Sequence, residues 1–314
     1  MPERRLVLLG LVLCALATLY LAWGLRAPYG YILTLRATKL AALVITGVAV
    51  GAATILFQTV AANRLLTPGI VGFDALYVFI QTALVVALGA GGHATLPVLA
   101  RFGAETACLM VAGLLLFGTL FRRGADDVLR MILTGVILGV LLRGLSSLAG
   151  RLLDPSEFAV VQQASVASFG AVDTTQLALA AGVLFVAMAA ALRLAPSLDA
   201  AALGRTTSRA IGLDHDRTVL AALALVTLCV ALSTALVGPV TFLGLLAASL
   251  AHAALGTWRH VLLIPAAGLI GAMILVAGQT VFERLLGLQS TLSIVVECAG
   301  GLLFLALVLK RPVR

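Results

Sequence analysis

Apolar residues fill the chain in ten long runs that are separated by short polar segments. The runs are near-continuous, and most are about 17–24 residues long, which suits helices crossing a hydrocarbon core of about 30 Å. We therefore predict ten membrane-spanning helices. Their ranges are roughly 6–24, 40–62, 70–90, 97–120, 128–149, 176–194, 218–237, 240–256, 261–283 and 291–309.

Composition supports this interpretation. Of the 314 residues, 62% are hydrophobic and 11% are charged, and the mean hydropathy is +1.15. A soluble domain has roughly 45–50% apolar and about 25% charged residues. A β-barrel would show shorter segments of alternating polarity, and backbone groups in lipid must be satisfied internally, which leaves helices. The predicted fold class is an all-α polytopic membrane protein, with residues 1–314 forming one transmembrane domain.

The basic residues predict an orientation. The net charge of +8 is distributed over the loops and forms no basic, aromatic-rich patch, so no nucleic-acid partner is expected. Assigning loops alternately with the N-terminus inside places fourteen Lys and Arg residues inside and seven outside. This favours cytoplasmic N- and C-termini. The outside residues need a reason of their own, and they are Arg26, Arg36, Lys39, Arg101, Arg143, Arg151 and Arg284.

The polar joint at 57–77 links the second and third runs. Asn63 and Arg64 end one run, a turn follows at Thr67-Pro68-Gly69, and the next run carries Asp74 in its first turns. An acidic residue inside a span has a functional or structural role by default. For Asp74 the alternative is a helix-start aspartate at the positive end of the helix dipole.

Two further segments do not fit simple connections. Outside, the short apolar piece at about 155–172 predicts a re-entrant or interfacial helix. Inside, the segment 195–217 predicts two short polar helices that form a docking surface. Ser197 or Asp199 would cap the first helix and Gly204 would end it, and Gly212 would end the second.

Other polar and small residues within the runs allow several roles. Arg101 and Glu105 are spaced to pair as i and i+4. Glu297, in the last run, suits either a central cavity or a pairing with a neighbouring helix. The glycine pairs Gly47/Gly51 and Gly135/Gly139 allow close helix packing, or a gate. No phosphate-binding loop, metal-ligand spacing or nucleophile motif is present, so the chain is not expected to be an enzyme.

The joint between the second and third runs reads Asn63-Arg64-Leu65-Leu66-Thr67-Pro68-Gly69-Ile70-Val71-Gly72. It resembles the signature joint of the FecCD family, the permease subunits of ABC importers for iron–siderophores, haem and cobalamin. Other motifs of that family occur in the same order along the chain. Leu35-Arg36-Ala37-Thr38-Lys39-Leu40-Ala41 resembles its entry to the second span. Gly238-Pro239-Val240-Thr241-Phe242-Leu243-Gly244-Leu245 resembles a second signature, and 203–212 resembles the coupling helices that seat the ATPase.

The chain also departs from the family pattern. Thr38 and Arg64 replace prolines, Ala248-Ser249 replaces Pro-His, His252 replaces an arginine, and 287–291 lacks the usual Glu-Leu-Pro. These departures resemble one branch of the family, in which two unlike permeases pair and carry ferric catecholate or mixed siderophores.

The resemblance implies a function and a set of roles. The chain would be the permease subunit of an ABC importer in the cytoplasmic (inner) membrane that carries ferric siderophore. Its partners would be two ATPase subunits, a second permease subunit and an extracytoplasmic binding protein. ATP and Mg would bind the ATPase subunits, and this chain would hold no cofactor and no metal.

The resemblance also assigns residues to these roles. Binding-protein docking falls to Arg36, Lys39 and Arg284. ATPase coupling falls to Leu198, Leu203, Gly204, Arg205, Arg209 and Gly212, within coupling helices at about 198–212. The translocation path and its joints fall to Gln58, Asn63, Pro68, Gly69, Gly72, Gly238, Pro239 and Gly244.

Three alternatives remain at this stage. The same machinery could import haem, cobalamin or another metal chelate. An ion-coupled secondary transporter would need Asp74 and Glu297 as acids near the midplane, and it would leave the polar segment 195–217 unexplained. A membrane enzyme is the third alternative, and no catalytic constellation supports it.

Overall fold

The computed structural model describes residues 2–25, 27–95, 97–122, 128–170, 172–284, 287 and 292–310. Within these ranges every predicted run contains one long helix. The ten helices are α1 (Pro2–Ala22), α2 (Tyr29–Val60), α3 (Asp74–Thr95), α4 (Val98–Arg122), α5 (Val128–Gly150), α7 (Thr174–Ala201), α9 (His215–Val237), α10 (Leu243–Leu255), α11 (His260–Arg284) and α12 (Leu292–Lys310). Three short helices complete the described chain: η1 (Gly69–Phe73), α6 (Pro155–Ala164) and α8 (Arg205–Ala210). The predicted fold class is confirmed.

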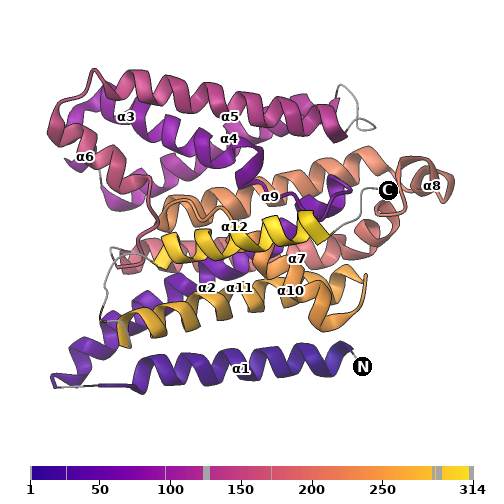
Figure 1. Ribbon diagram of the computed structural model, residues 1–314, viewed down its shortest axis with the longest axis horizontal. Helices are drawn as coiled ribbons and strands as arrows, with labels where there is room; N and C mark the ends of the chain where they lie inside the picture. The colour runs from indigo at the N-terminus through magenta and orange to yellow at the C-terminus, as the bar shows by residue number, and fades with distance from the viewer. Residues whose placement is uncertain are drawn as a thin grey trace.

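The long helices lie side by side in a bundle (Figure 1). Helix α1 forms one edge, α3, α4 and α5 form the opposite edge, and α2 packs between α11 and α9 near the centre. Helix α8 marks one end of the bundle and α6 the other (Figure 1), and we call these the α8 end and the α6 end. Helix α1 begins, and α12 finishes, at the α8 end. The count of basic residues predicts that this end faces the cytoplasm.

Small residues bring α2 and α11 into backbone contact. A Cβ atom added to Gly47 would lie 2.3 Å from the Ala272 nitrogen, and one added to Gly51 would lie 2.3 Å from the Ala267 oxygen. Only glycine leaves room for this approach, as in small-residue interfaces between membrane helices. The predicted packing role of the first glycine pair is therefore confirmed.

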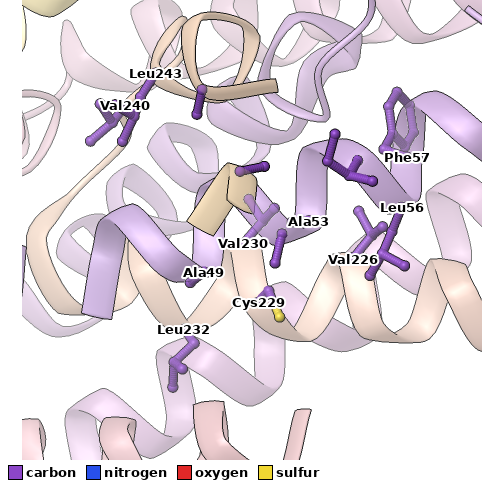
Figure 2. Close-up of a cluster of buried hydrophobic side chains, with 14 of the residues drawn as sticks. Ala49, Ala53, Leu56, Phe57, Val226, Cys229, Val230, Leu232, Val240 and Leu243 are labelled. Atoms are coloured by element: carbon purple, nitrogen blue, oxygen red, sulfur yellow. The ribbon is translucent and has the colours of Figure 1, made fainter. Parts of the chain in front are cut away.

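The core forms where α2 meets α9. Figure 2 shows Ala49, Ala53, Leu56 and Phe57 beside Val226, Cys229 and Val230, all of them buried side chains. The same cluster includes Val240 and Leu243, from the segment that follows α9. Small and large apolar side chains alternate here, which lets the helices interdigitate. In contrast, α1 packs one face against α11 and leaves the other exposed, as expected for a helix at the lipid-facing edge.

Two expectations about helix boundaries were wrong. The second span begins at Tyr29, well before residue 40, and α7 continues past Pro196 to Ala201. The predicted separate helix at 200–203 is therefore the end of α7, and only α8 is a short helix in this region. Ala195 and Leu198, on either side of the proline, are fully buried, and this packing outweighs the backbone hydrogen bond lost at Pro196.

The two remaining short segments follow the sequence more closely. Gly204 and Gly212 flank α8 with φ angles of 95° and 86°, which are left-handed values that favour glycine. Helix α6 occupies the first part of the segment predicted at 155–172, and residues 165–170 and 172–173 are not helical. Whether α6 enters the membrane stays a prediction.

Candidate functional site

Two of the connections between successive helices reach into the bundle. Helix α2 ends at Val60, and the chain then runs through residues 61–73, the first joint, before α3 begins. Helix α9 ends at Val237, and residues 238–242, the second joint, lead into α10. The first joint enters from the α8 end and the second from the α6 end. Both reach one small cavity of about 20 Å³, which is lined by Val50, Thr54, Thr67, Pro68, Gly69, Asp74, Val230, Thr234, Val240 and Thr241.

Asp74 connects the two joints. The Thr241 hydroxyl donates a hydrogen bond of 2.6 Å to the Asp74 carboxylate, which lies where α3 begins. A Cβ atom on Gly69 would lie 2.6 Å from the same carboxylate, so glycine leaves room for it. Of the two roles left open for Asp74, the geometry fits the helix-start residue, which here braces the joints.

Two polar side chains fold the turn of the first joint, one in the last turn of α2 and one in the joint itself. The Gln58 side-chain nitrogen donates to the Arg64 carbonyl at 2.6 Å, and the Asn63 side-chain oxygen accepts from the Leu65 nitrogen at 2.9 Å. Ala62 has a φ of 47°, which is unusual for a residue other than glycine. The turn signals in the sequence thus correspond to a closely bonded turn at the α8 end of α2.

Glycines place the first joint against α5. Gly72 has a φ of 106°, and its Cα lies 3.2 Å from where a Cβ on Gly139 would be. A Cβ on Gly135 would lie 2.8 Å from the Val71 oxygen. The pair Gly135/Gly139 therefore packs against the joint rather than against another long helix.

The second joint rests on its neighbours. Gly238 has a φ of 99°, and its missing Cβ would lie 3.1 Å from the Ala167 Cα, in the loop after α6. The Ser168 nitrogen donates to the Val237 oxygen at 2.7 Å, just before the joint and Pro239. Beyond it, a Cβ on Gly244 would lie 2.0 Å from the Thr54 hydroxyl oxygen of α2.

The outside basic residues at the α6 end are mostly held within the chain. Arg36 is 9% exposed and donates to the Leu21, Trp23 and Gly24 carbonyls at 2.8, 3.0 and 2.9 Å, which closes the end of α1. Lys39 pairs with Glu283, which also accepts hydrogen bonds from Gln279 and Tyr20. The buried Nε of Arg284 has no hydrogen-bond partner among the described residues. Docking by these three residues stays a prediction.

Two polar pockets explain three more of the outside arginines. Each has a volume of about 360 Å³, and they lie on either side of α6. Arg101 lines one of them and pairs with Glu105 at 3.9 Å, as predicted. Arg143 and Arg151 line the other, together with Ser146 and Gln162. Charges that would be costly in lipid therefore face polar cavities. Arg26 lies outside the described residues.

The predicted coupling residues gather at the α8 end. Leu198 is buried in the last turns of α7, whereas Leu203, in the turn before α8, is 61% exposed. Arg209 donates to Asp216 at 2.6 Å, and Arg205 lies 3.3 Å from the same carboxylate. The Ser208 hydroxyl and the His215 Nδ1 are 2.9 Å apart. These contacts fix α8 against the start of α9.

A cleft that the sequence did not predict opens beside these residues. It has a volume of about 490 Å³ and lies between the first joint, the end of α7 and the turn at 256–259 between α10 and α11. We call it the α8-end cleft. On its floor the Asp199 carboxylate accepts from the His260 backbone nitrogen at 2.9 Å and lies 2.5 Å from the His260 Nδ1. The His260 Nε2 lies 2.7 Å from the Thr59 hydroxyl.

This contact chain joins three helices. Because an ionised carboxylate only accepts hydrogen bonds, the His260 Nδ1 carries a proton toward Asp199. Asp199 belongs to α7, His260 starts α11, and Thr59 lies in the last turn of α2, directly before the first joint. The sequence predicted that Ser197 or Asp199 would cap a short helix within 195–217. In the structure, Asp199 instead caps α11. This site could not be predicted from a local motif, because Asp199 and His260 lie about 140 and 200 positions after Thr59 in the sequence.

The described chain is thus a multi-pass helical membrane protein in which two joints between successive helices meet inside the bundle, an arrangement that suits a membrane transport subunit. Its sequence then defines the family. The chain belongs to the FecCD transport family, whose model matches residues 7–310.

Named relatives agree with this assignment. The chain is 36% identical over 304 residues to the petrobactin import system permease protein YclO of Bacillus subtilis (strain 168), covering 97% of this chain and 96% of that protein. It is 28% identical over 276 residues to the petrobactin import system permease protein FatC of Bacillus anthracis, covering 88% and 78%. A solved structure described as an inward-facing conformation of a metal-chelate type ABC transporter shares the fold, with a TM-score of 0.83, 22% identity and coverage of 99% and 100%.

Proposed function

We propose that this chain is the permease subunit of an ABC importer that carries ferric siderophore across the cytoplasmic membrane. The observation that carries the proposal is the 36% identity to a petrobactin import permease over 97% of the chain. In this proposal two ATPase subunits supply ATP hydrolysis, and a second permease subunit completes the path. An extracytoplasmic binding protein delivers the cargo, and this chain makes and breaks no bond in it.

The pockets beside α6 suit such a cargo. Ferric catecholate chelates carry negative charge, and Arg101, Arg143 and Arg151 line the two cavities at the end where cargo would arrive. Arginine binds oxygen anions through a planar fork of donors. The two joints, which meet at Asp74 and Thr241, give the spans next to the path places where the helix is already broken.

Uptake into proteoliposomes tests this function. The complex of this chain with its co-expressed ATPase, second permease and binding protein is reconstituted with ATP inside, and uptake of radioactive iron is measured. We expect ATP-dependent uptake of a ferric catecholate or mixed siderophore, and none of cobalamin or haem. Uptake of cobalamin alone, or uptake driven by an ion gradient without ATP, would overturn the proposal.

Docking of the binding protein is best tested at Arg284. Reversing Arg36 would also remove three hydrogen bonds to the turn after α1, so folding and docking would change together. We expect Arg284→Glu to weaken binding of the loaded binding protein at least tenfold, because charge pairs at an interface guide encounter and register. Arg284→Lys keeps the charge and should bind almost as the natural chain does. Equal affinity for both variants would remove Arg284 from the docking surface.

Coupling to the ATPase is tested at Gly204. Its φ of 95° disfavours any side chain, so Gly204→Leu would distort the turn before α8. We expect the assembled complex to lose cargo-stimulated ATP hydrolysis. Gly10→Leu is the matched control, because no atom lies within 4 Å of a Cβ built there. Unchanged stimulation in the Gly204 variant would show that this turn does not receive the ATPase stroke.

A further inference from the structure

An exposed tryptophan stands on a fixed turn at the rim of the α8-end cleft. Trp258 is 71% exposed, yet the turn that carries it is held on both sides. Before the turn, Arg5 donates to the Ala254 carbonyl at 2.8 Å, and after it Asp199 caps α11 at His260. Gly256 adopts a left-handed φ of 59° where α10 ends. The structure therefore presents the indole in a defined position instead of leaving it on a loose loop.

An arginine stacks on this tryptophan. The Arg64 guanidinium carbon lies 3.8 Å from the centre of the Trp258 ring, and the His252 ring lies 6.0 Å away at a tilt. Tryptophan and arginine are the residues most enriched among those that dominate protein–protein binding energy. Arg64 also replaces the family's usual proline in the first joint, so the stack joins that joint to the turn.

The cleft itself has the features of a contact site. Leu203, which is 61% exposed, lines it together with Trp258. Gln58 also lines it and is 5% exposed, and its buried side-chain oxygen has no hydrogen-bond partner within the part of the chain that the structure describes. A buried acceptor of this kind carries a cost in free energy. Leu203 belongs to the segment already proposed for the ATPase, which makes the cleft continuous with that surface.

We propose that the α8-end cleft is a second contact site for the ATPase subunit, with Trp258 as its aromatic anchor. This rests on the proposed function, which supplies the ATPase as partner. The ATPase would insert a segment that places an apolar side chain between Trp258 and Leu203. An acidic side chain of that segment would approach Arg259, which lines the cleft.

Such a contact would reach the first joint without passing through α8. The turn that carries Trp258 leads directly into His260, which contacts Asp199 on α7 and Thr59 on α2. Thr59 lies in the last turn before the first joint. A displacement of the turn at 256–259 would therefore be transmitted through these hydrogen bonds to the end of α2, where the first joint begins. Because the docking surface has two parts, its geometry would fix the orientation of the ATPase as well as its affinity.

Site-specific photo-crosslinking tests the contact in the assembled complex. A benzophenone amino acid replaces Trp258, Leu203 or Trp23, the last as a control at the α6 end. We expect crosslinks to the ATPase from positions 258 and 203 and none from 23, with the product identified by mass spectrometry. Crosslinks from 203 alone would overturn the second contact while leaving the proposed function intact. If neither position crosslinks in a complex that assembles, the proposed coupling surface fails as well.

Affinity of the purified chain for the ATPase gives a second measurement. We expect Trp258→Ala to weaken binding about tenfold or more, Trp258→Phe to weaken it less, and the control Trp23→Ala to leave it unchanged. Arg259→Glu reverses an exposed charge without removing packing, and it should also weaken binding severalfold. The proposal is wrong if Trp258→Ala and Arg259→Glu both bind the ATPase as tightly as the natural chain does. It is also wrong if the two substitutions change only the interaction of the chain with lipid vesicles.

Discussion

The two joints are held in shape in different ways. The first joint takes its shape from its own sequence: Gln58 and Asn63 bond to backbone atoms within the turn, and Gly72 supplies a left-handed residue. The second joint takes its shape from its surroundings. Gly238 lies against Ala167, and the backbone at Val237 is bonded to Ser168. One joint is encoded locally, whereas the other depends on a loop about 70 residues earlier in the chain.

This difference separates the α8 end of the bundle from the α6 end. The first joint can keep its internal shape while the segments around the α8-end cleft move, because its hydrogen bonds travel with it. The second joint would change its shape whenever the loop after α6 moves. A signal from an ATPase at the α8 end would therefore arrive at a rigid turn. Cargo or a binding protein at the α6 end would act on the second joint, whose shape changes with the loop after α6.

The largest predicted effect breaks the first joint. We expect Gly72→Val to destabilise the chain by about 2–5 kcal/mol, because a side chain is strained at a φ of 106° and would meet the Gly135 oxygen at 2.9 Å. The measurement is the midpoint of thermal unfolding of the purified chain in detergent. Gly10→Val, in α1, is the control with open space around it and should change the midpoint little. Equal midpoints for the two variants would mean that α5 yields to the joint.

The features that could be predicted from the sequence are the locally encoded ones, and those that depend on distant packing could not be predicted. The ten helices, the turn at Asn63 and the left-handed Gly204 and Gly212 rest on local patterns, and the sequence was sufficient for them. The break predicted between the span ending at 194 and a helix capped by Ser197 or Asp199 is absent, because burial of Ala195 and Leu198 outweighs the local effect of the proline between them. The contact of Asp199 with His260 could not be predicted, because it depends on how α7 and α11 pack.

A smaller effect is expected where α10 leaves the second joint. Gly244→Ala would place a Cβ 2.0 Å from the Thr54 hydroxyl oxygen, and overpacking of this kind costs about 1–3 kcal/mol. The clash lies with a side-chain atom, so a second substitution should relieve it. We expect the double variant Gly244→Ala/Thr54→Ala to unfold at a higher temperature than Gly244→Ala alone. No recovery would show that the limit is the distance between the α2 and α10 backbones.

The smallest effect tests the hydrogen bond between Thr241 of the second joint and Asp74, which directly follows the first joint. Thr241→Val removes the 2.6 Å bond to Asp74 and keeps the shape of the side chain, for a loss of about 0.5–1.5 kcal/mol. The neighbouring cavity of about 20 Å³ is large enough for one water molecule, which would bond to the carboxylate and limit the loss.

A double-mutant cycle of Thr241→Val with Asp74→Asn separates this bond from other effects of each substitution. If the two joints are independent supports, the effects of the two substitutions on unfolding will add, and ATP-driven uptake will fall only as far as stability does. If the bond holds the joints in register during transport, the coupling energy will be near 1 kcal/mol. Uptake per ATP hydrolysed will then fall in Thr241→Val while its unfolding midpoint stays close to that of the natural chain. If the two effects add and uptake per ATP hydrolysed is unchanged, the hydrogen bond between Thr241 and Asp74 does not couple the two joints during transport.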